Sequence, residues 1–465
     1  MFSLREKKLL HGWSMAQYAY SYVLCPNNID ELKSTIKLAG KNKLSICPIG
    51  SARSYGDEIL NEDNILVDCT YMNRILSWDP KTGIMTVEPG VTLLQALKEC
   101  LKDNWKLPVI PGTRFPTIGG CTANNVHGKN SFKNSNFGDW VLEFDMLLSS
   151  NEIVTCSREQ NSDLFYAAIG GIGMLGIFTR ITIQLEKLPS PNLDVRKWTV
   201  PNLEAMIEDI TTSTSNCDYV VGQIDCFKKG NNLGRGTIHT ATNANNKLLR
   251  NNYIDDFEIP ERVFSVIPAN WVLEFGKRSM SCFTMRCISS LKYYADSFSR
   301  MNEAHVESFL KFHFLLDRIP YWPDLYKNGL YEFEPLIPTS KAYRAYSEII
   351  NLSHEYKMSP YIAGIKFHKK DDFLLSFSLN GFSIGFDFPV LPARSEDQKE
   401  MLYKMHDITA ESGGLVYLAK DNIMLPEHFK KLYNNKVDEF FAIKKKYDPN
   451  MLFQSNLFRR LFLSN

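Results

Sequence analysis

Residues 111–130, PGTRFPTIGGCTANNVHGKN, place a histidine directly after a run of glycine, proline and small or amide residues. A loop without bulky side chains lets backbone N–H groups approach an anionic group closely. His127 follows this loop and is followed at once by Gly-Lys-Asn, so its imidazole could face the bound group and titrate near neutrality as an acid or base. The stretch therefore predicts an anionic ligand with a histidine beside it.

Two further glycine-rich turns occur within residues 48–176, PIGSARSYGDE after a strand-like run and AAIGGIGMLG before one. Any one of the three turns is most simply a tight connection, but consecutive backbone amides in such turns also form nests for phosphate oxygens. Three turns in one region favour a dinucleotide. Neither the Gly-x-Gly-x-x-Gly turn between a strand and a helix nor the P-loop pattern is present, so a different nucleotide or flavin fold is expected.

The elements that must position these turns alternate between helix and strand. A helix is predicted within NNIDELKSTIKLAGK, residues 27–41, with Asn28 at the N-cap and Glu31 three residues later. KLSICPIG, NILVDCT and IMTVEPG are short strand-like runs, and Thr92 is placed to cap a helix over TLLQALKECLKDN. These patterns predict a mixed α/β region over residues 1–190.

Residues 195–410 differ in character, because they are rich in aromatic residues and contain the polar insertion KKGNNLGRGTIHTATNANNKLLRNN. They end in the strand-like runs YIAGIKFH, LLSFSLN and FSIGFDFPV, which predict an antiparallel sheet with loops around a ligand. Residues 411–465 are again helix-like and basic.

Composition narrows the function. At 465 residues the chain should form two or three folded units, and a net charge of +1 gives no reason to expect a nucleic-acid partner. No run of about 18 apolar residues and no cleavable leader is found, so we expect neither secretion nor a membrane span. The ten cysteines are scattered without a Cys-x-x-Cys pair, which favours reduced thiols in a cytoplasmic protein and no metal site.

Several segments, in this order, resemble the vanillyl-alcohol-oxidase (PCMH-type) FAD flavoproteins: GSARSYGD, LPVIPGTRFPTIGGCTANNVHGKN, FGDWVLEFDML, DLFYAAIGGIGMLGIFTRITI, FDFPV, VYLAKDN and YDPNMLFQSNLFRRL. The likeness is strong over residues 45–190 and from residue 411, and looser between them. It implies an α+β fold with a two-part FAD-binding domain, residues 1–194 and 411–465. Residues 195–410 would form a substrate domain built on an antiparallel sheet with flanking helices.

The resemblance also implies the residues that bind FAD, in the three glycine-rich turns and in the segment that returns from the substrate domain. They are Gly50, Ser51, Ala52, Arg53, Ser54, Tyr55, Gly56, Gly112, Thr113, Thr117, Ile118, Gly119, Gly120, Cys121, Asn124, His127, Gly128, Gly171, Gly173, Gly176, Ile177, Tyr417 and Lys420.

Arg53 bears on how FAD is held. Relatives that bond FAD covalently through the first loop carry a histidine at this position, and a guanidinium cannot replace the imidazole. We therefore expect non-covalent FAD, with His127 as the second candidate for a tether.

In this family the reaction is oxidation of a secondary alcohol, which needs a cation beside the flavin and a donor or base near the substrate hydroxyl. The resemblance assigns these catalytic roles to Lys420 and His127, with Tyr417 three residues before the lysine. Without the resemblance, a solvated lysine, a core tyrosine and a histidine in a turn are the simpler interpretations.

Four residues are expected to contact substrate. Glu332 and Glu334 in YEFEPLIP point the same way on a strand, and the mycobacterial members of the family carry glutamines there. The two carboxylates either pair with cations such as Lys366 or meet different substrate hydroxyls, and an exposed acidic strand face is the alternative. Gly385 stands where those members have a cysteine beside the flavin.

The expected function is oxidation of the 2-hydroxyl of a polyprenylphosphoryl-β-D-ribose, the first half of an epimerisation to the arabinose form that a short-chain reductase partner completes. The alternatives are a soluble sugar, polyol or aldonolactone oxidase of the same fold, and a non-catalytic flavin-binding protein. The basic, aromatic segment over residues 277–300 is either an ordinary helix or a peripheral contact with the inner face of a membrane.

Overall fold

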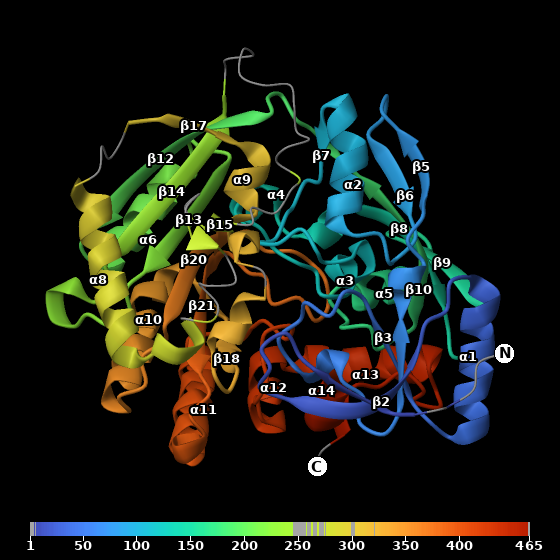
Figure 1. Ribbon diagram of the computed structural model, residues 1–465. Helices are drawn as coiled ribbons and strands as arrows, with labels where there is room; N and C mark the ends of the chain where they lie inside the picture. The colour runs from blue at the N-terminus through green and yellow to red at the C-terminus, as the bar shows by residue number, and fades with distance from the viewer. Residues whose placement is uncertain are drawn as a thin grey trace.

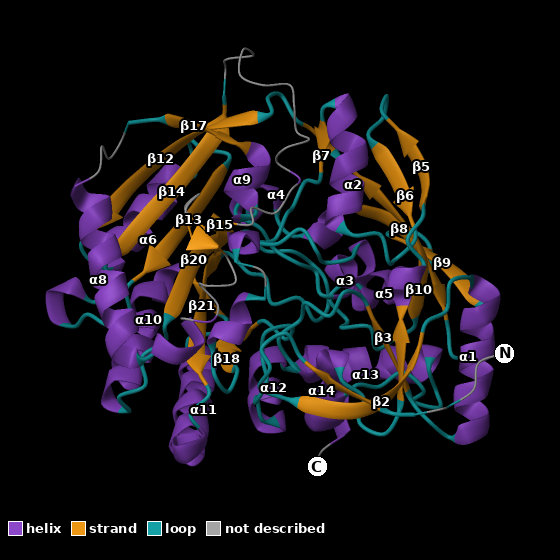
Figure 2. Ribbon diagram, in the orientation of Figure 1, coloured by secondary structure: helices purple, strands orange, loops and turns teal. Residues whose placement is uncertain are grey.

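The computed structural model describes residues 4, 6–244, 257, 262–263, 267–268, 274, 276–298, 303–319 and 321–463. The fold is α+β, as predicted, with helices packed around several sheets (Figure 2). In Figure 1 the blue strands and red helices of the two chain ends lie together, beside the large green-to-orange sheet of the central residues.

The first sheet has the order β1-β2-β4-β3, with β2, β4 and β3 parallel. As predicted, Asn28 caps helix α1, because its side chain accepts a hydrogen bond from Glu31 N. The elements are β1 (Lys8–His11), β2 (Tyr18–Leu24), α1 (Ile29–Asn42), β3 (Ile46–Ile49) and β4 (Ile65–Asp68).

The second sheet is antiparallel, in the order β5-β6-β10-β8-β9. The predicted helix after Thr92 forms, and Thr92 and Gln95 close a capping box at its start. The elements are β5 (Ile75–Asp79), β6 (Ile84–Val87), α2 (Leu93–Cys100), α3 (Ile118–Ala123), α4 (Ser131–Asn134), β8 (Val141–Leu147), β9 (Ile153–Ser157), α5 (Ser162–Ala168) and β10 (Ile177–Gln184), with β7 (Trp105–Lys106) paired to β11 (Glu186–Lys187).

The central residues build a large antiparallel sheet in the order β17-β12-β14-β13-β20-β21-β19-β22, with β18 also paired to β21. Met206 and Ile210 of α6 pack against Gly222 on one face. The strands are β12 (Asn192–Val200), β13 (Tyr219–Ile224), β14 (Gly236–Asn243), β17 (His305–Ser308), β18 (Leu330–Phe333), β19 (Pro335–Pro338), β20 (Ile362–His368), β21 (Gly381–Pro389) and β22 (Leu415–Val416), beside the small pair β15 (Arg262–Val263) and β16 (Ile267–Pro268). The helices are α6 (Leu203–Ser213), α8 (Cys282–Phe298), α9 (Phe309–His313), α10 (Thr339–Glu355) and α11 (Ser395–Glu411).

Two sequence expectations within this region were wrong. The polar insertion contains β14, which pairs with both β12 and β13, so a run of threonines and histidine forms an inner strand. LLSFSLN is not a strand: Phe373, Leu375 and Phe377 are all buried, and Asp371 accepts hydrogen bonds from Phe373 N and Ser376 Oγ that fold the segment into turns.

The last residues form α12 (Pro426–Tyr433), α13 (Asn435–Tyr447) and α14 (Asn456–Phe458), the red helices of Figure 1. Phe453 forms a parallel bridge with Ile46 of β3. The buried Lys444 ammonium contacts Asp448 and donates to the carbonyls of Phe453 and Met174, at 2.6 and 2.7 Å. Because Met174 belongs to the third glycine-rich turn, the C-terminal helices fix that turn in place.

Candidate active site

A cavity of about 950 Å³ lies between the glycine-rich turns and the large sheet. Its walls come from all three turns, from strands β12, β13, β14, β20 and β21, and from the segment after β22. Its volume is at the upper end of the range for small-molecule and cofactor sites.

Most of the predicted cofactor residues line this cavity: Gly50, Ser51, Ala52, Arg53, Ser54, Tyr55, Gly112, Thr113, Thr117, Gly119, Gly120, Asn124, His127, Gly128, Gly173, Gly176, Ile177, Tyr417 and Lys420. Four do not, namely Gly56, Ile118, Cys121 and Gly171. Ile118 and Cys121 point into the core and are fully buried there. Gly56 and Gly171 pack against the carbonyls of Asp421 and Ala167, where an added Cβ would lie within 2.3 Å of oxygen.

The first two turns approach each other so closely that a side chain would not fit between them. A Cβ on Gly50 would lie 2.3 Å from Thr117 Oγ1. Thr117 in turn accepts a hydrogen bond from Gly120 N at 3.1 Å, at the start of α3. The glycine is therefore required by the packing of the two turns at the cavity wall.

Lys420 is a cation at the cavity wall. Its Nζ donates to both carboxylate oxygens of Glu332, at 2.7 and 2.8 Å, and lies 3.8 Å from the centre of the Tyr55 ring. Burial opposes the charged form, but Glu332 and Glu334 outweigh burial and raise the pKa of Lys420. Lys420 is therefore an ammonium at neutral pH, and the solvated-lysine interpretation is wrong.

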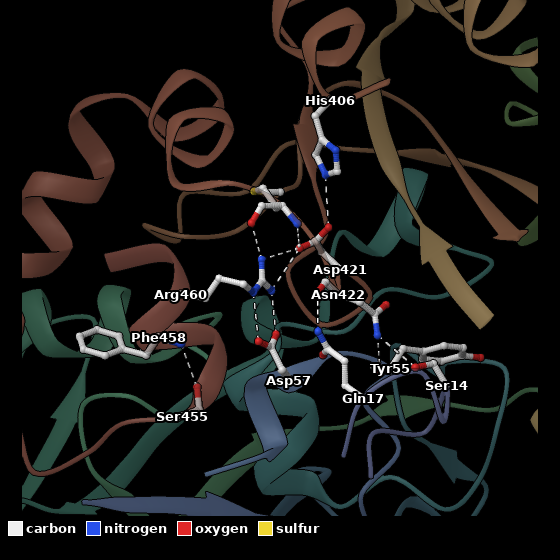
Figure 3. A network of polar contacts seen from close by, with 11 residues as sticks. Ser14, Gln17, Tyr55, Asp57, His406, Asp421, Asn422, Ser455, Phe458 and Arg460 are labelled. Carbon is white, nitrogen blue, oxygen red and sulfur yellow. Dashed lines mark hydrogen bonds and ion pairs between the residues drawn. The ribbon is translucent and has the colours of Figure 1, made fainter. Parts of the chain in front are cut away.

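The residue after Lys420 is tied into an ionic network, drawn in Figure 3. Asp421 Oδ1 contacts His406 Nε2 at 3.2 Å, and Asp421 Oδ2 accepts from Arg460 at 3.4 Å and from Met424 N at 2.9 Å. Arg460 also donates to both carboxylate oxygens of Asp57, at 2.7 and 3.0 Å. The network thus joins the return segment to the C-terminal helices and to the first glycine-rich turn.

Asn422 completes the anchoring of this segment (Figure 3). Its Nδ2 donates to Tyr55 O and to Ser14 Oγ, both at 3.0 Å. Its carbonyl accepts from Gln17 Nε2 at 2.7 Å. The two residues that follow Lys420 are thus hydrogen-bonded to neighbouring segments, and these contacts hold Lys420 in position.

His127 faces Glu334 and is buried. Its Nε2 lies 3.3 Å from Glu334 Oε1, and its ring packs against His368, Phe377 and Tyr417. Burial lowers the pKa of His127 in spite of Glu334, so the expectation that it titrates near neutrality is corrected to a neutral imidazole at pH 7. Burial also disfavours the charged form of Glu334, but His127 and Lys366 outweigh it and hold the pKa of that carboxyl well below its ordinary range.

Tyr417 is a buried phenol with a structural contact. Its hydroxyl donates to Asn124 O at 3.0 Å, and its ring stacks on Phe377 at 4.5 Å. Burial raises its pKa well above the ordinary value. The geometry gives Tyr417 a part in holding the second glycine-rich turn against the return segment.

The two glutamates face the cavity, so the exposed strand face is excluded. Glu332 pairs with Lys420, and Glu334 accepts from Ser383 Oγ at 3.1 Å in addition to its contact with His127. A Cβ on Gly385 would lie 3.1 Å from Glu332 Oε1, so the carboxylates occupy the space in front of this glycine.

The sequence analysis missed Asp387, which lines the same wall. It lies opposite Glu332 in the β18–β21 register, and burial together with Glu332 raises its pKa well above the ordinary value. Burial therefore favours its protonated form. Gly385 and Asp387 are two residues apart on one strand, so they lie on the same face. This spacing could have indicated from the sequence that Asp387 lines the cavity.

Arg53 lies at the cavity wall among aromatic side chains. Its guanidinium carbon is 3.9 Å from the centre of the Trp13 ring and 4.9 Å from that of Phe115. An arginine in this position packs by cation–π contacts and offers no imidazole nitrogen.

Several buried polar atoms at the cavity have no hydrogen-bond partner among the residues that the structure describes: Arg53 Nε, Glu58 Oε1 and Oε2, Asn124 Oδ1 and His127 Nδ1. Buried polar groups are normally satisfied, so these atoms indicate a polar ligand that supplies both donors and acceptors. Within the same described ranges, no cluster of His, Cys, Asp and Glu could hold a metal ion.

Comparison with known proteins identifies that ligand. Residues 20–157 match the FAD binding domain family. The whole chain is similar to the decaprenylphosphoryl-beta-D-ribose oxidase of Mycolicibacterium smegmatis, with 27% identity over 98% of each chain. Partial similarities include the D-lactate dehydrogenase of Anaerostipes hadrus, 29% identical over 35% of each chain, and the L-gulonolactone oxidase of Bos taurus, 23% identical over 45% of this chain and 49% of that one. The glycine-rich turns, the unpartnered polar atoms and the cation at the cavity fit FAD.

Proposed function

We propose that this chain, an FAD-dependent oxidoreductase, oxidises the 2-hydroxyl of a polyprenylphosphoryl-β-D-ribose to the 2-keto sugar. The observation that carries the proposal is that Lys420 and His127, from distant parts of the chain, meet the glycine-rich turns at one cavity, each beside its own carboxylate. The similarity over 98% of both chains supports the substrate class.

We propose that residues 1–194 and 411–465 hold the cofactor and that residues 195–410 hold the sugar. When bound, FAD supplies the oxidant and takes up the two electrons that leave the carbinol carbon. The Lys420 ammonium stabilises negative charge that develops beside it and orients the substrate hydroxyl. The Glu332 carboxylate holds that ammonium in place.

His127 takes the hydroxyl proton in this proposal. Because the ionised Glu334 accepts from Nε2–H, the lone pair lies on Nδ1, which has no partner within the described residues. A neutral imidazole whose lone pair is not already engaged by a donor is the form required of a general base. Lys366, Asp387 and the two carboxylates in front of Gly385 would set which sugar hydroxyls are accepted.

Anaerobic reduction of the flavin tests the proposal. Decaprenylphosphoryl-β-D-ribose should bleach the flavin, and the free sugar ribose should do so far more slowly. Bleaching by an aldonolactone or a polyol in preference to the lipid-linked sugar would establish the soluble oxidase instead, which the partial similarity to L-gulonolactone oxidase and the paired carboxylates of the cavity favour. No bleaching by any of these compounds would leave a flavin-binding protein without this activity.

The proposal includes a short-chain reductase that reduces the keto product to the arabinose epimer, because the oxidation alone removes the stereocentre at C2 and a reduction must set the opposite configuration. Incubation of the enzyme and substrate with such a reductase and NADH or NADPH should yield the arabinose form. The 2-keto sugar should accumulate when the reductase is left out.

A peripheral contact with a membrane is also part of the proposal. Among the described helices, none is both long and apolar enough to cross a bilayer. Helix α8 nevertheless exposes large apolar side chains at helical spacing, with Phe283 76%, Leu291 70% and Phe298 88% exposed. Asp296, on the opposite side of the helix, contacts Lys197 of β12. Helix α8 therefore packs on the sheet through its polar side (Figure 1).

Cations surround this apolar face. Arg286 is exposed, Lys292 is half exposed and paired with Asp296, and Lys277 and Arg278 precede the helix. Arg300, at the end of the predicted segment, lies outside the described residues. An apolar helix face flanked by cations is suited to the surface of an anionic bilayer, where a lipid-linked substrate resides.

A further inference from the structure

Glu58 is a cavity residue that the proposed reaction does not use. It lies in the short helical turn Asp57–Ile59, directly after the first glycine-rich turn, and is 3% exposed. Glu58 is one of the residues that line the cavity, and in the described part of the chain neither of its buried carboxyl oxygens has a hydrogen-bond partner. A Cβ on Gly56 would lie 2.8 Å from Glu58 Oε2, which places the carboxyl group against the backbone of the turn.

The groups around Glu58 give little support to a carboxylate. Asp57 beside it pairs with Arg460, which Asp421 also contacts. Cys47 Sγ donates to the Glu58 backbone carbonyl at 3.2 Å, and the Tyr417 hydroxyl is committed to Asn124. Burial raises the pKa of Glu58 to about 8, because it outweighs the nearby Ser54 hydroxyl and the Arg460 charge, which favour the carboxylate.

At neutral pH the Glu58 side chain is therefore an uncharged acid. It carries one O–H donor, and leaving that donor unsatisfied in a buried site is costly. The group that lies in this cavity when the protein is loaded is FAD, which offers phosphate, carbonyl and ring-nitrogen acceptors. A carboxylate in the same place would repel the cofactor's phosphates, whereas the protonated acid can bind them or any other acceptor.

We propose that Glu58 is a cofactor-binding residue whose carboxyl O–H donates a hydrogen bond to an acceptor atom of bound FAD. FAD affinity is then controlled by the protonation of one side chain. The inference depends on FAD as the cofactor and is independent of the sugar substrate, so failure of the substrate assay leaves it intact.

The test measures FAD release from the full-length FAD-loaded protein by dilution, followed by flavin fluorescence. Because only the protonated form donates, the Kd for FAD should rise about tenfold between pH 7 and pH 9 for a pKa of about 8. Glu58→Gln keeps a donor and cannot ionise, so its Kd should hardly change over this range. Glu58→Leu should bind FAD weakly at both pH values. The matched control is Glu62→Gln on the exposed part of the same loop, which should behave as the parent.

Two results would overturn the proposal: a pH dependence that persists in Glu58→Gln, or parental FAD affinity in Glu58→Leu with an unchanged circular dichroism spectrum. A second measurement locates the acceptor. If it is on the isoalloxazine ring, riboflavin shows the same pH dependence and the visible flavin spectrum of Glu58→Leu shifts. If it is on the phosphates or the adenosine, riboflavin binding is independent of pH and the spectrum is unchanged.

Discussion

Lys420 Nζ donates to both carboxylate oxygens of Glu332, at 2.7 and 2.8 Å, across the wall of the cavity. Glu334 follows two residues later, and its Oε1 lies 3.3 Å from His127 Nε2. Each of the two side chains assigned to catalysis thus has its own carboxylate from the β18 segment. The carboxylates keep the lysine charged, whereas burial keeps the histidine neutral in spite of Glu334 at its Nε2.

Replacing Lys420 by alanine should slow flavin reduction by substrate about 100-fold or more, because one preorganised electrostatic contact is worth about 3 kcal/mol. The variant should still bind FAD. It should also lose stability, on the order of 3 kcal/mol, because Glu332 is left buried without its partner. Anaerobic stopped-flow kinetics and thermal unfolding measure the two effects.

Lys430→Ala, on the exposed side of α12, is the matched control and should behave as the parent. Glu332→Gln tests the pair from the other side. It removes the carboxylate while keeping an acceptor for the ammonium, so it should alter the reduction rate less than Lys420→Ala does. A Lys420→Ala variant with normal FAD content and the parental rate constant would exclude Lys420 from the reaction.

The pH profile of flavin reduction should follow His127. Burial lowers the pKa of His127 from its ordinary value of about 6.5, and the neutral form carries the lone pair. The rate should therefore be constant around pH 7 and fall only as the pH drops below about 6.5, through the lowered pKa. Glu334→Gln removes a carboxylate that raises this pKa, so the acid limb should move to still lower pH.

Anaerobic reduction measured between about pH 5 and pH 8 defines that limb. A limb centred above pH 6.5 in the parent would show that the group responsible is not the buried imidazole. A limb that Glu334→Gln leaves in place would lead to the same conclusion.

FAD should leave the protein on acid precipitation, because Arg53 cannot form the tether that an imidazole forms at its position. Yellow supernatant above a colourless pellet is the expected result. Flavin fluorescence that migrates with the denatured chain on a gel would instead indicate a covalent bond, and His127→Ala would show whether that residue carries it.

The local features of this fold could be predicted because short-range patterns determine them. Asn28 and Thr92 cap their helices as their spacing indicates, since a cap needs only the residues three positions ahead. The glycine-rich turns were also recognisable, because a close approach such as that of Gly50 to Thr117 excludes every other residue.

The pairings across the cavity could not be predicted in the same way. Lys420 and Glu332 are 88 residues apart, and their contact depends on the β18–β21 register and on where the chain returns after β22. For that reason the sequence offered Lys366 as the partner of the glutamates, and it missed Asp387. LLSFSLN was assigned to a strand because its sequence pattern does not reveal the local hydrogen bonds to Asp371, three residues before it, that fold the segment into turns.

Helix α8 should bind anionic bilayers through its apolar face. The full-length protein is expected to float with vesicles that contain phosphatidylserine at low salt and to float poorly with neutral vesicles, because each cation near the surface contributes on the order of 1 kcal/mol.

The double variant Phe283→Ser and Leu291→Ser should reduce flotation, because it removes apolar side chains that are 76% and 70% exposed, respectively. It leaves the buried Asp296 contact undisturbed. Tyr71→Ser, which removes an aromatic side chain that is 57% exposed elsewhere, is the control and should float as the parent. Equal flotation of all three proteins, or none with anionic vesicles, would show that α8 is not a membrane contact.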